Sequence, residues 1–190
     1  MLKQFQLKNG EKIIIRHVEE SDIDGVWNNF NEVIEEGVYL PIFFPVRSQF
    51  EKQSWYDVLK REKEICLIAK RPKLFGSDAV IGQVEISNLE WDAAAHVGSL
   101  GIIVKKKYRD QGLGYQLIDL AIKESERLNK KQKLILSCFS NNKRALHLYE
   151  KMGFKVIGIR NRQFYMDSSY YDEILMDLWI EDYLQKILTL

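Results

Sequence analysis

The chain is predicted to fold as one mixed α/β domain that spans residues 1–190. Its length of 190 residues fits the usual size of a single domain. Its hydrophobic content of 46% and charged content of 29% are ordinary for a globular protein. Segments rich in β-branched residues alternate with segments whose apolar residues recur at helical spacing, and no repeat or linker divides the chain.

The N-terminal third is predicted to contain one strand and two helices. Residues 13–18 are rich in isoleucine and valine, which favours a strand. Ser21 is a predicted N-cap for a helix over residues 21–36, because apolar residues follow it at helical spacing. A second helix, residues 48–59, begins with Ser-Gln-Phe-Glu, which is the pattern of a capping box.

The middle of the chain is predicted to contain an antiparallel meander followed by a helix. Strands are expected at residues 65–70, 79–87 and 97–104, and the short links between them indicate the meander. Residues 113–128 carry apolar side chains on one face of a helix. The next strand is expected at residues 134–139.

The C-terminal part completes the prediction with a helix and two strands. A helix over residues 142–152 ends at Gly153, a residue type that readily takes the left-handed conformation after a helix. Strands are expected at residues 155–160 and 172–179, and residues 182–190 are expected to add a short helical turn.

Several functional classes are excluded by composition. The longest apolar runs, residues 13–15 and 100–104, are far shorter than the ~20 residues that cross a bilayer, so no membrane association is expected. Residues 1–12 lack the apolar stretch of a secretory signal, which favours a cytoplasmic location. Cys66 and Cys138 lie far apart in the sequence with no second Cys or His nearby, so neither a metal site nor a disulfide framework is expected.

Positive charge is concentrated in residues 105–160, which carry 14 basic and 5 acidic side chains. The residues on either side are acidic, a distribution that fits an anionic partner at this segment and a cationic partner elsewhere, or else solvated helix faces. No recognised nucleic-acid-binding motif accompanies the charge, and no nucleic acid is expected as a partner.

The loop between the strand at 97–104 and the following helix has the features of an anion site. Gly112 and Gly114 allow a tight turn, and free amides at the helix start point outward with the positive end of the helix dipole. Arg109 and the lysines at 105–107 add positive charge. The sequence fits neither a mononucleotide P-loop nor a dinucleotide-binding fingerprint, so the glycines are consistent with a phosphate of another ligand or with a purely structural loop.

Two motifs resemble the GNAT superfamily of acyl-CoA-dependent N-acetyltransferases. The first resembles the Arg/Gln-x-x-Gly-x-Gly/Ala signature and consists of Arg109, Asp110, Gln111, Gly112, Leu113 and Gly114. The second is similar to the Asn-x-x-Ala-x-x-x-Tyr-x-x-x-Gly-Phe stretch and covers residues 142–154. The element order resembles the family over residues 13–179, and residues 170–176 resemble its ribosomal-protein and small-amine acetyltransferase branches.

The resemblance implies a fold of three layers. A central mixed, mostly antiparallel sheet of six or seven strands is flanked by about four helices. A V-shaped splay is expected between the strands at 97–104 and 134–139.

The resemblance also implies acetyl-CoA as cosubstrate. The pantetheine arm would pair with the backbone of Ile102, Ile103 and Val104, and the amides of Gln111, Gly112, Leu113 and Gly114 would hold the pyrophosphate. Asn142 would contact the same arm, although its position also suits a helix N-cap. The cations at residues 105–107, Lys143, Arg144 and Lys151 would steer the coenzyme.

Tyr149 matches the family's general acid, which protonates the departing thiolate. The family commonly carries a glutamate shortly before the stretch that reads Gly-Ile-Ile-Val here, but no carboxylate occupies that place. Glu85, on the preceding strand, is therefore the expected base, directly or through water. His96 is a second candidate because imidazole titrates near neutral pH.

The acceptor is expected to be a peptide N-terminus, a polyamine or another small amine. The first two helices, the loop at 37–47 and the final strands supply acids and aromatics that suit a cation. A noncatalytic acetyl-CoA-binding module on the same fold is the alternative. A homodimer is also open, since homodimers are common in the resembled family. The acidic residues are Glu32, Glu35, Glu36, Asp167, Asp172 and Glu173, and the aromatic ones are Tyr39, Phe43, Phe44, Phe164, Tyr165, Tyr170 and Tyr171.

Overall fold

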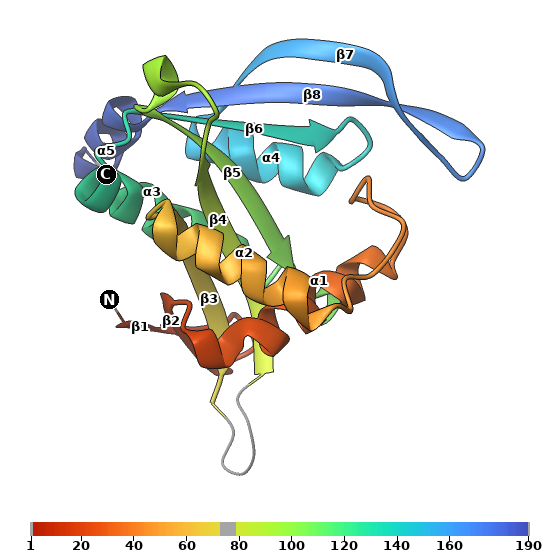
Figure 1. The fold of residues 1–190 in the computed structure, drawn as a ribbon. Coiled ribbons are helices and arrows are strands. Elements are labelled where there is room, and N and C mark those ends of the chain that lie inside the picture. Colours follow the sequence, from red (N-terminus) through yellow and green to blue (C-terminus); the bar gives the residue numbers. More distant parts are fainter. Residues whose placement is uncertain (1, 73–78, 190) are drawn as a thin grey trace.

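A computed structural model describes residues 2–72 and 79–189 of the chain. It contains an eight-stranded sheet, with helices on both faces, in the order β1-β2-β3-β4-β5-β6-β8-β7 (Figure 1). All neighbouring strands are antiparallel except β5 and β6, which run parallel. The predicted mixed α/β fold with a mostly antiparallel sheet is therefore confirmed.

The elements agree with the predicted order. The strands are β1 (Leu2–Gln6), β2 (Lys12–His17), β3 (Ile65–Arg71), β4 (Ala79–Asn88), β5 (Val97–Val104), β6 (Lys133–Phe139), β7 (Lys155–Met166) and β8 (Ser169–Trp179). The α-helices are α1 (Ile23–Ile34), α2 (Gln49–Arg61), α3 (Leu113–Asn129), α4 (Lys143–Met152) and α5 (Ile180–Leu188). Three short 3₁₀ helices are η1 (Glu20–Asp22), η2 (Asp92–Ala94) and η3 (Lys106–Tyr108).

The sheet has one or two more strands than the sequence predicts. The additional strand is β1, which pairs with β2 in a hairpin that turns at Gly10, where φ is +87°. β7 and β8 are also longer than predicted, because the hairpin between them continues to the Met166–Ser169 pair. None of the described helices is long and apolar enough to cross a membrane.

The predicted start of the first helix is wrong. Ser21 lies within η1, and the N-cap residue of α1 is Asp22, whose side chain makes no capping bond to α1. Instead, the Asp22 carboxylate accepts hydrogen bonds from Arg16 at 2.6 and 3.0 Å and from Lys70 at 2.9 Å. The capping box predicted at Ser48 is present, since its side chain accepts a bond from the Glu51 amide.

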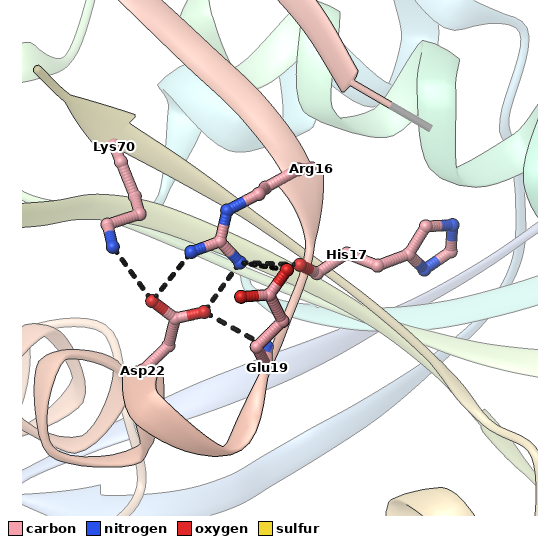
Figure 2. A network of polar contacts seen from close by, with 5 residues as sticks. All are labelled: Arg16, His17, Glu19, Asp22 and Lys70. Carbon is pink, nitrogen blue, oxygen red and sulfur yellow. Dashed lines mark hydrogen bonds and ion pairs between the residues drawn. The ribbon is translucent and has the colours of Figure 1, made fainter.

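A buried polar network fixes the first helix against the sheet (Figure 2). Arg16 of β2 and Lys70 of β3 converge on Asp22, whose side chain is 1% exposed. The backbone amide of Glu19 donates a further bond to the same carboxylate. Burial raises the pKa of Asp22, but the bonds from Arg16 and Lys70 outweigh that effect and hold the pKa below its ordinary value.

Two apolar clusters lie on opposite faces of the sheet. The larger one joins the sheet to α3, where Leu113 and Leu117 approach Gly82 of β4. The smaller one lies under α1 and α2, which cover the other face of β3–β5 in Figure 1. Because side chains alternate along a strand, Gln83, Glu85 and Ser87 of β4 face α1 and α2 rather than α3.

The predicted splay lies between β5 and β6. These strands pair only from Val97–Lys133 to Ser99–Ile135 and then separate. β5 continues its pairing with β4 as far as Val104, while β6 continues with β8 as far as Phe139. One edge of β5 is therefore open over residues 100–104.

Candidate active site

A cavity of about 1030 Å³ lies at this opening. Its lining comes from the N-terminal hairpin, α1 and the loop after it, β4, β5 and the loop after it, the start of α3, β6, α4 and β7. Among the residues predicted from the sequence, those on the lining are Glu85, Ile102, Ile103, Val104, Arg109, Asp110, Gln111, Gly112, Gly114, Asn142 and Tyr149. Leu113 is not among them because its side chain is buried in the core, 1% exposed.

The open edge of β5 has the hydrogen-bonding pattern of an unfilled strand position. The Lys105 amide donates to the Ile81 carbonyl of β4 at 3.0 Å. Because bonding alternates along an antiparallel strand, Ile103 bonds toward β4, and the backbone groups of Ile102 and Val104 face the opening. An extended amide chain can pair with such an edge.

Arg109 has a structural role in this loop. Its Nε–H donates to the Val104 carbonyl at 2.8 Å, and its two Nη groups donate to the Glu36 carboxylate at 2.6 Å each. The charge of Arg109 is thus paired with Glu36, and its side chain is 13% exposed. The contact holds the end of β5 and the loop close to the C-terminal end of α1.

The start of α3 has the backbone geometry on which the predicted anion site depends. Gly112 has φ +84°, a left-handed conformation that glycine adopts without strain. The first helical bond runs from the Gln116 amide to the Gly112 carbonyl, so the amides just after Gly112 have no partner within the helix. At Gly114, an added Cβ would lie 3.0 Å from Leu148, so a small residue is needed for α3 and α4 to approach.

The N-terminal hairpin supports the same loop, a role that the sequence did not indicate. The Asn9 amide donates to Gln111 Oε1 at 3.1 Å, and the Lys8 amide is 3.4 Å from the Gln111 carbonyl. Lys8 also lines the cavity. The contact between the hairpin and the loop leaves little signal in the sequence, because 102 residues separate Asn9 from Gln111.

Only some of the predicted cations lie at the cavity. Arg144 and Lys151 line it, whereas Lys106, Lys107 and Lys143 do not. Lys105 instead forms an ion pair with Glu32. Lys8, Arg144 and Lys151 therefore put positive charge on the lining, which suits a phosphate group, and the Arg144 guanidinium is also paired with Asp110 at 3.0 Å.

Tyr149 lies on α4 with its side chain buried against the ring of Phe154, 5.9 Å between centroids. Asn142 caps this helix by accepting a bond from the Ala145 amide, and Gly153 ends it at φ +103°. Burial, with the Cys138 thiol nearby, raises the pKa of Tyr149. The phenol therefore stays protonated at neutral pH and is available as a proton donor.

Glu85 lines the same cavity from the strand β4. Burial is the main cause that raises its pKa to about 7, and Glu64 raises it further. Two donors act in the opposite direction: Trp55 Nε1–H at 3.4 Å and the Gln83 amide at 3.5 Å. Gln83 is in turn held by Asn29 of α1, whose amide donates to Gln83 Oε1 at 2.9 Å. A carboxylate with this pKa is half-ionised near neutral pH, as a general base requires.

The structure does not bring the second candidate base to the cavity. His96 is exposed and is absent from the described lining. His147, which the sequence did not single out, does line the cavity, as do Ser99 and Ser137. No described group of three or more His, Cys, Asp or Glu side chains is arranged to hold a metal ion.

The predicted acidic acceptor wall is not formed as expected. Of the acids and aromatics named for it, only Tyr39 and Phe164 line the cavity. Glu32, Glu36 and Glu173 are paired with basic side chains, and Phe43 and Phe44 are exposed to solvent. The acceptor side of the cavity is therefore less acidic than the composition of the segments predicted to frame it suggests.

Comparisons with known proteins identify the family of the chain. The model of the acetyltransferase (GNAT) family matches residues 34–154. A spermidine N(1)-acetyltransferase of Escherichia coli is 30% identical over 85 residues, which are 45% of this chain and 46% of that protein. The match thus spans about half the length of the curated relative.

Solved structures show the same fold. The yncA protein of Salmonella typhimurium, determined with its cofactor acetyl-CoA, has a TM-score of 0.79 at 17% identity, covering 88% of this chain and 94% of that one. A ribosomal-protein-alanine N-acetyltransferase of Brucella melitensis has a TM-score of 0.76 at 19% identity, covering 87% and 98%.

Proposed function

Starting from the fact that this chain belongs to the acetyltransferase (GNAT) family, we propose that it transfers an acetyl group from acetyl-CoA directly to a primary amine. The observation that carries the proposal is the meeting of three features on one cavity. These are the glycine turn at the start of α3, the carboxyl of Glu85 and the phenol of Tyr149.

The residues of the cavity fit acetyl-CoA. The amides after Gly112, with Lys8 and Arg144, suit its pyrophosphate, and the open backbone of Ile102 and Val104 suits its pantetheine arm. The Val104 carbonyl already accepts a bond from Arg109, so its amide is the group left for the arm. Asn142 lies on the lining close by and also caps α4.

Glu85 and Tyr149 would divide the proton transfers. Acetyl-CoA supplies the acetyl group as a thioester. As the amine nitrogen forms its bond to the acetyl carbon, Glu85 accepts a proton from the nitrogen, directly or through water. As the carbon–sulfur bond breaks, the Tyr149 hydroxyl gives its proton to the sulfur. The neutral phenol and half-ionised carboxyl fit these opposite tasks.

The proposal is tested by thiol release from acetyl-CoA in the presence of N-terminal peptides, polyamines and other primary amines. Release that depends on one amine class, with the acetylated amine identified by mass spectrometry, would support the enzyme. Binding of acetyl-CoA by calorimetry with no release for any amine would favour the noncatalytic module, and absent binding would contradict both.

A homodimer that acts in the cytoplasm remains part of the proposal. Its structural support is β7, which is an edge strand with exposed apolar side chains at Val156, Ile157 and Ile159. An exposed edge of this kind favours association with another chain. Light scattering after size-exclusion chromatography should give twice the chain mass of 22.4 kDa, and a monomer at all concentrations would contradict the dimer.

A further inference from the structure

The wall that carries Glu85 is built from two strands in fixed register. β4 and β5 place Glu85 directly opposite Gly101, and Ser87 directly opposite Ser99. All four residues line the cavity. Because directly opposite residues point to the same face of a sheet, the Glu85 carboxyl lies beside the position where residue 101 would carry a side chain.

Gly101 leaves that position open. An added Cβ would meet no atom within 4 Å, and the residue is exposed within its strand. Its φ is not positive, so the backbone conformation does not require glycine. A glycine in a strand weakens the strand and often marks a place where a ligand approaches closely. Its effect here is to leave space next to a carboxyl whose pKa is about 7.

The charge around this space is low. On the part of the described lining that comes from α1, the loop after it, β4, β5, β6 and β7, Glu85 is the only acidic or basic side chain. The apolar side chains there include Phe30, Phe139 and Phe164, and the last two rings stack at 4.4 Å. The other charged lining residues belong to the N-terminal hairpin, the loop after β5 and α4.

We propose that the space beside Gly101 receives the amino group of the acceptor, and that this acceptor is a primary amine with one positive charge next to an apolar or aromatic group. The inference rests on the proposed function and narrows its acceptor. Glu85 would hold the single amino group: the ammonium first loses one proton to solvent, and Glu85 accepts the second proton as the nitrogen bonds to the acetyl carbon. A polyamine would place a second ammonium against apolar side chains without a carboxylate partner, which is unfavourable because the charge loses its hydration.

The first test compares acceptors by kcat/KM with acetyl-CoA saturating. The amines are 2-phenylethylamine, a peptide that begins with phenylalanine, and spermidine. We expect kcat/KM for one or both of the singly charged amines to exceed kcat/KM for spermidine by at least tenfold. Which of the two has the higher kcat/KM distinguishes a small-amine acceptor from a peptide acceptor. Equal or faster acetylation of spermidine would overturn the inference while supporting the proposed function. No acetylation of any amine would contradict the proposed function itself.

The second test fills the space with Gly101→Val. Valine suits a strand, and the added side chain meets no atom at its Cβ. We expect KM for the acceptor to rise at least tenfold, with the Kd of acetyl-CoA within twofold and Tm unchanged or higher. The matched control is Gly158→Val, a strand glycine away from the lining whose added Cβ would lie 3.6 Å from Leu175. An acceptor KM for Gly101→Val that equals the control value would overturn the assignment.

Discussion

At the scale of single residues, the ionisation of Glu85 should make the activity depend on pH. The base must be ionised to accept a proton, and the pKa of Glu85 is about 7, so activity should rise with pH and level off above that value. Glu85→Gln should remove this limb and lower kcat about 100-fold. The pH profiles of wild type and Glu85→Gln are measured with the same amine. Ionisation of the amine affects both profiles equally, so a difference between them reports Glu85. The same limb in Glu85→Gln would exclude Glu85 as the base.

Gln83 and Asn29 should tune that pKa without touching the reacting atoms. The Asn29 amide fixes Gln83 so that the Gln83 amide faces Glu85, while Asn29 Oδ1 is buried without a hydrogen-bond partner. Such an incompletely satisfied buried group requires an explanation, and positioning of Glu85 provides one. Glu64 also raises the pKa of Glu85, and Glu85 in turn raises the pKa of the buried Cys66 thiol, which lies opposite Glu85 on β3.

Loss of the Gln83 donor should therefore raise the pKa of Glu85. In Gln83→Met and in Asn29→Leu, we expect the acidic limb of the pH profile to move up by about 0.5 pH unit, which corresponds to about 0.7 kcal/mol. The control is Asn31→Ala, since Asn31 lies on the same helix but its side chain bonds to the backbone of Val46 rather than to Gln83. If the acidic limb of the pH profile stays at the wild-type position in both variants, the bonds from Asn29 and Gln83 have no effect on the pKa of Glu85.

At the scale of elements, α4 depends on its two ends to place Tyr149. Asn142→Ala removes the bond to the Ala145 amide and should cost about 1 kcal/mol, which lowers Tm by about 2–4 °C in a chain of this size. Asn141→Ala is the control, because Asn141 is exposed and lies outside the helix. Thermal unfolding checks the difference, and equal Tm values would show that the cap is not stabilising. If the Kd for acetyl-CoA rises in Asn142→Ala but not in Asn141→Ala, Asn142 also contacts the pantetheine arm.

Elements with a strong local signal were predicted well, and those that depend on distant partners were not. Ser48 and Gly153 act as expected because a cap involves residues within one turn. β1 was missed because its pairing with β2 and its contact with the loop at Gln111 are not visible in a short window of sequence. The prediction of Ser21 as a cap is wrong because Asp22 is held by Arg16 and Lys70 from two strands, which no local pattern reveals.

At the scale of the whole molecule, the network of Figure 2 joins β2 and β3 to the start of α1. Asp22→Ala would remove the buried carboxylate that accepts bonds from Arg16 and Lys70, and it should lower the free energy of unfolding by about 3 kcal/mol. Since the folded pKa of Asp22 lies below its ordinary value of 3.8, the wild-type contribution should be present above that pH and decline as pH falls below it. Denaturant unfolding measures both effects.

The control for this prediction is Asp57→Ala, an exposed position on α2 whose carboxylate bonds only to Gln53. It should change the free energy of unfolding by less than about 0.5 kcal/mol. Similar losses for both variants, or a loss for Asp22→Ala that does not decline at low pH, would contradict the account of the network.

The arrangement of the cavity was only partly predictable from the sequence. Tyr149 and the glycine turn were identified by motifs, and both line the cavity, while Leu113 lies in the core because α3 must pack on the sheet. The pairing of Arg109 with Glu36 was not foreseen, since 73 residues separate them. The prediction of an acidic acceptor wall does not agree with the cavity lining for the same reason. The net charge of a sequence segment does not reveal which acids are paired with basic side chains in the folded chain.

The central claim is that Tyr149 donates a proton in acetyl transfer, and Tyr149→Phe tests it most directly. The substitution keeps the ring contact with Phe154 and removes only the hydroxyl. With the best amine found, thiol release from acetyl-CoA should fall at least 100-fold in kcat, while calorimetry gives an unchanged Kd for acetyl-CoA. Release within twofold of wild type, with the coenzyme still bound, would contradict the claim.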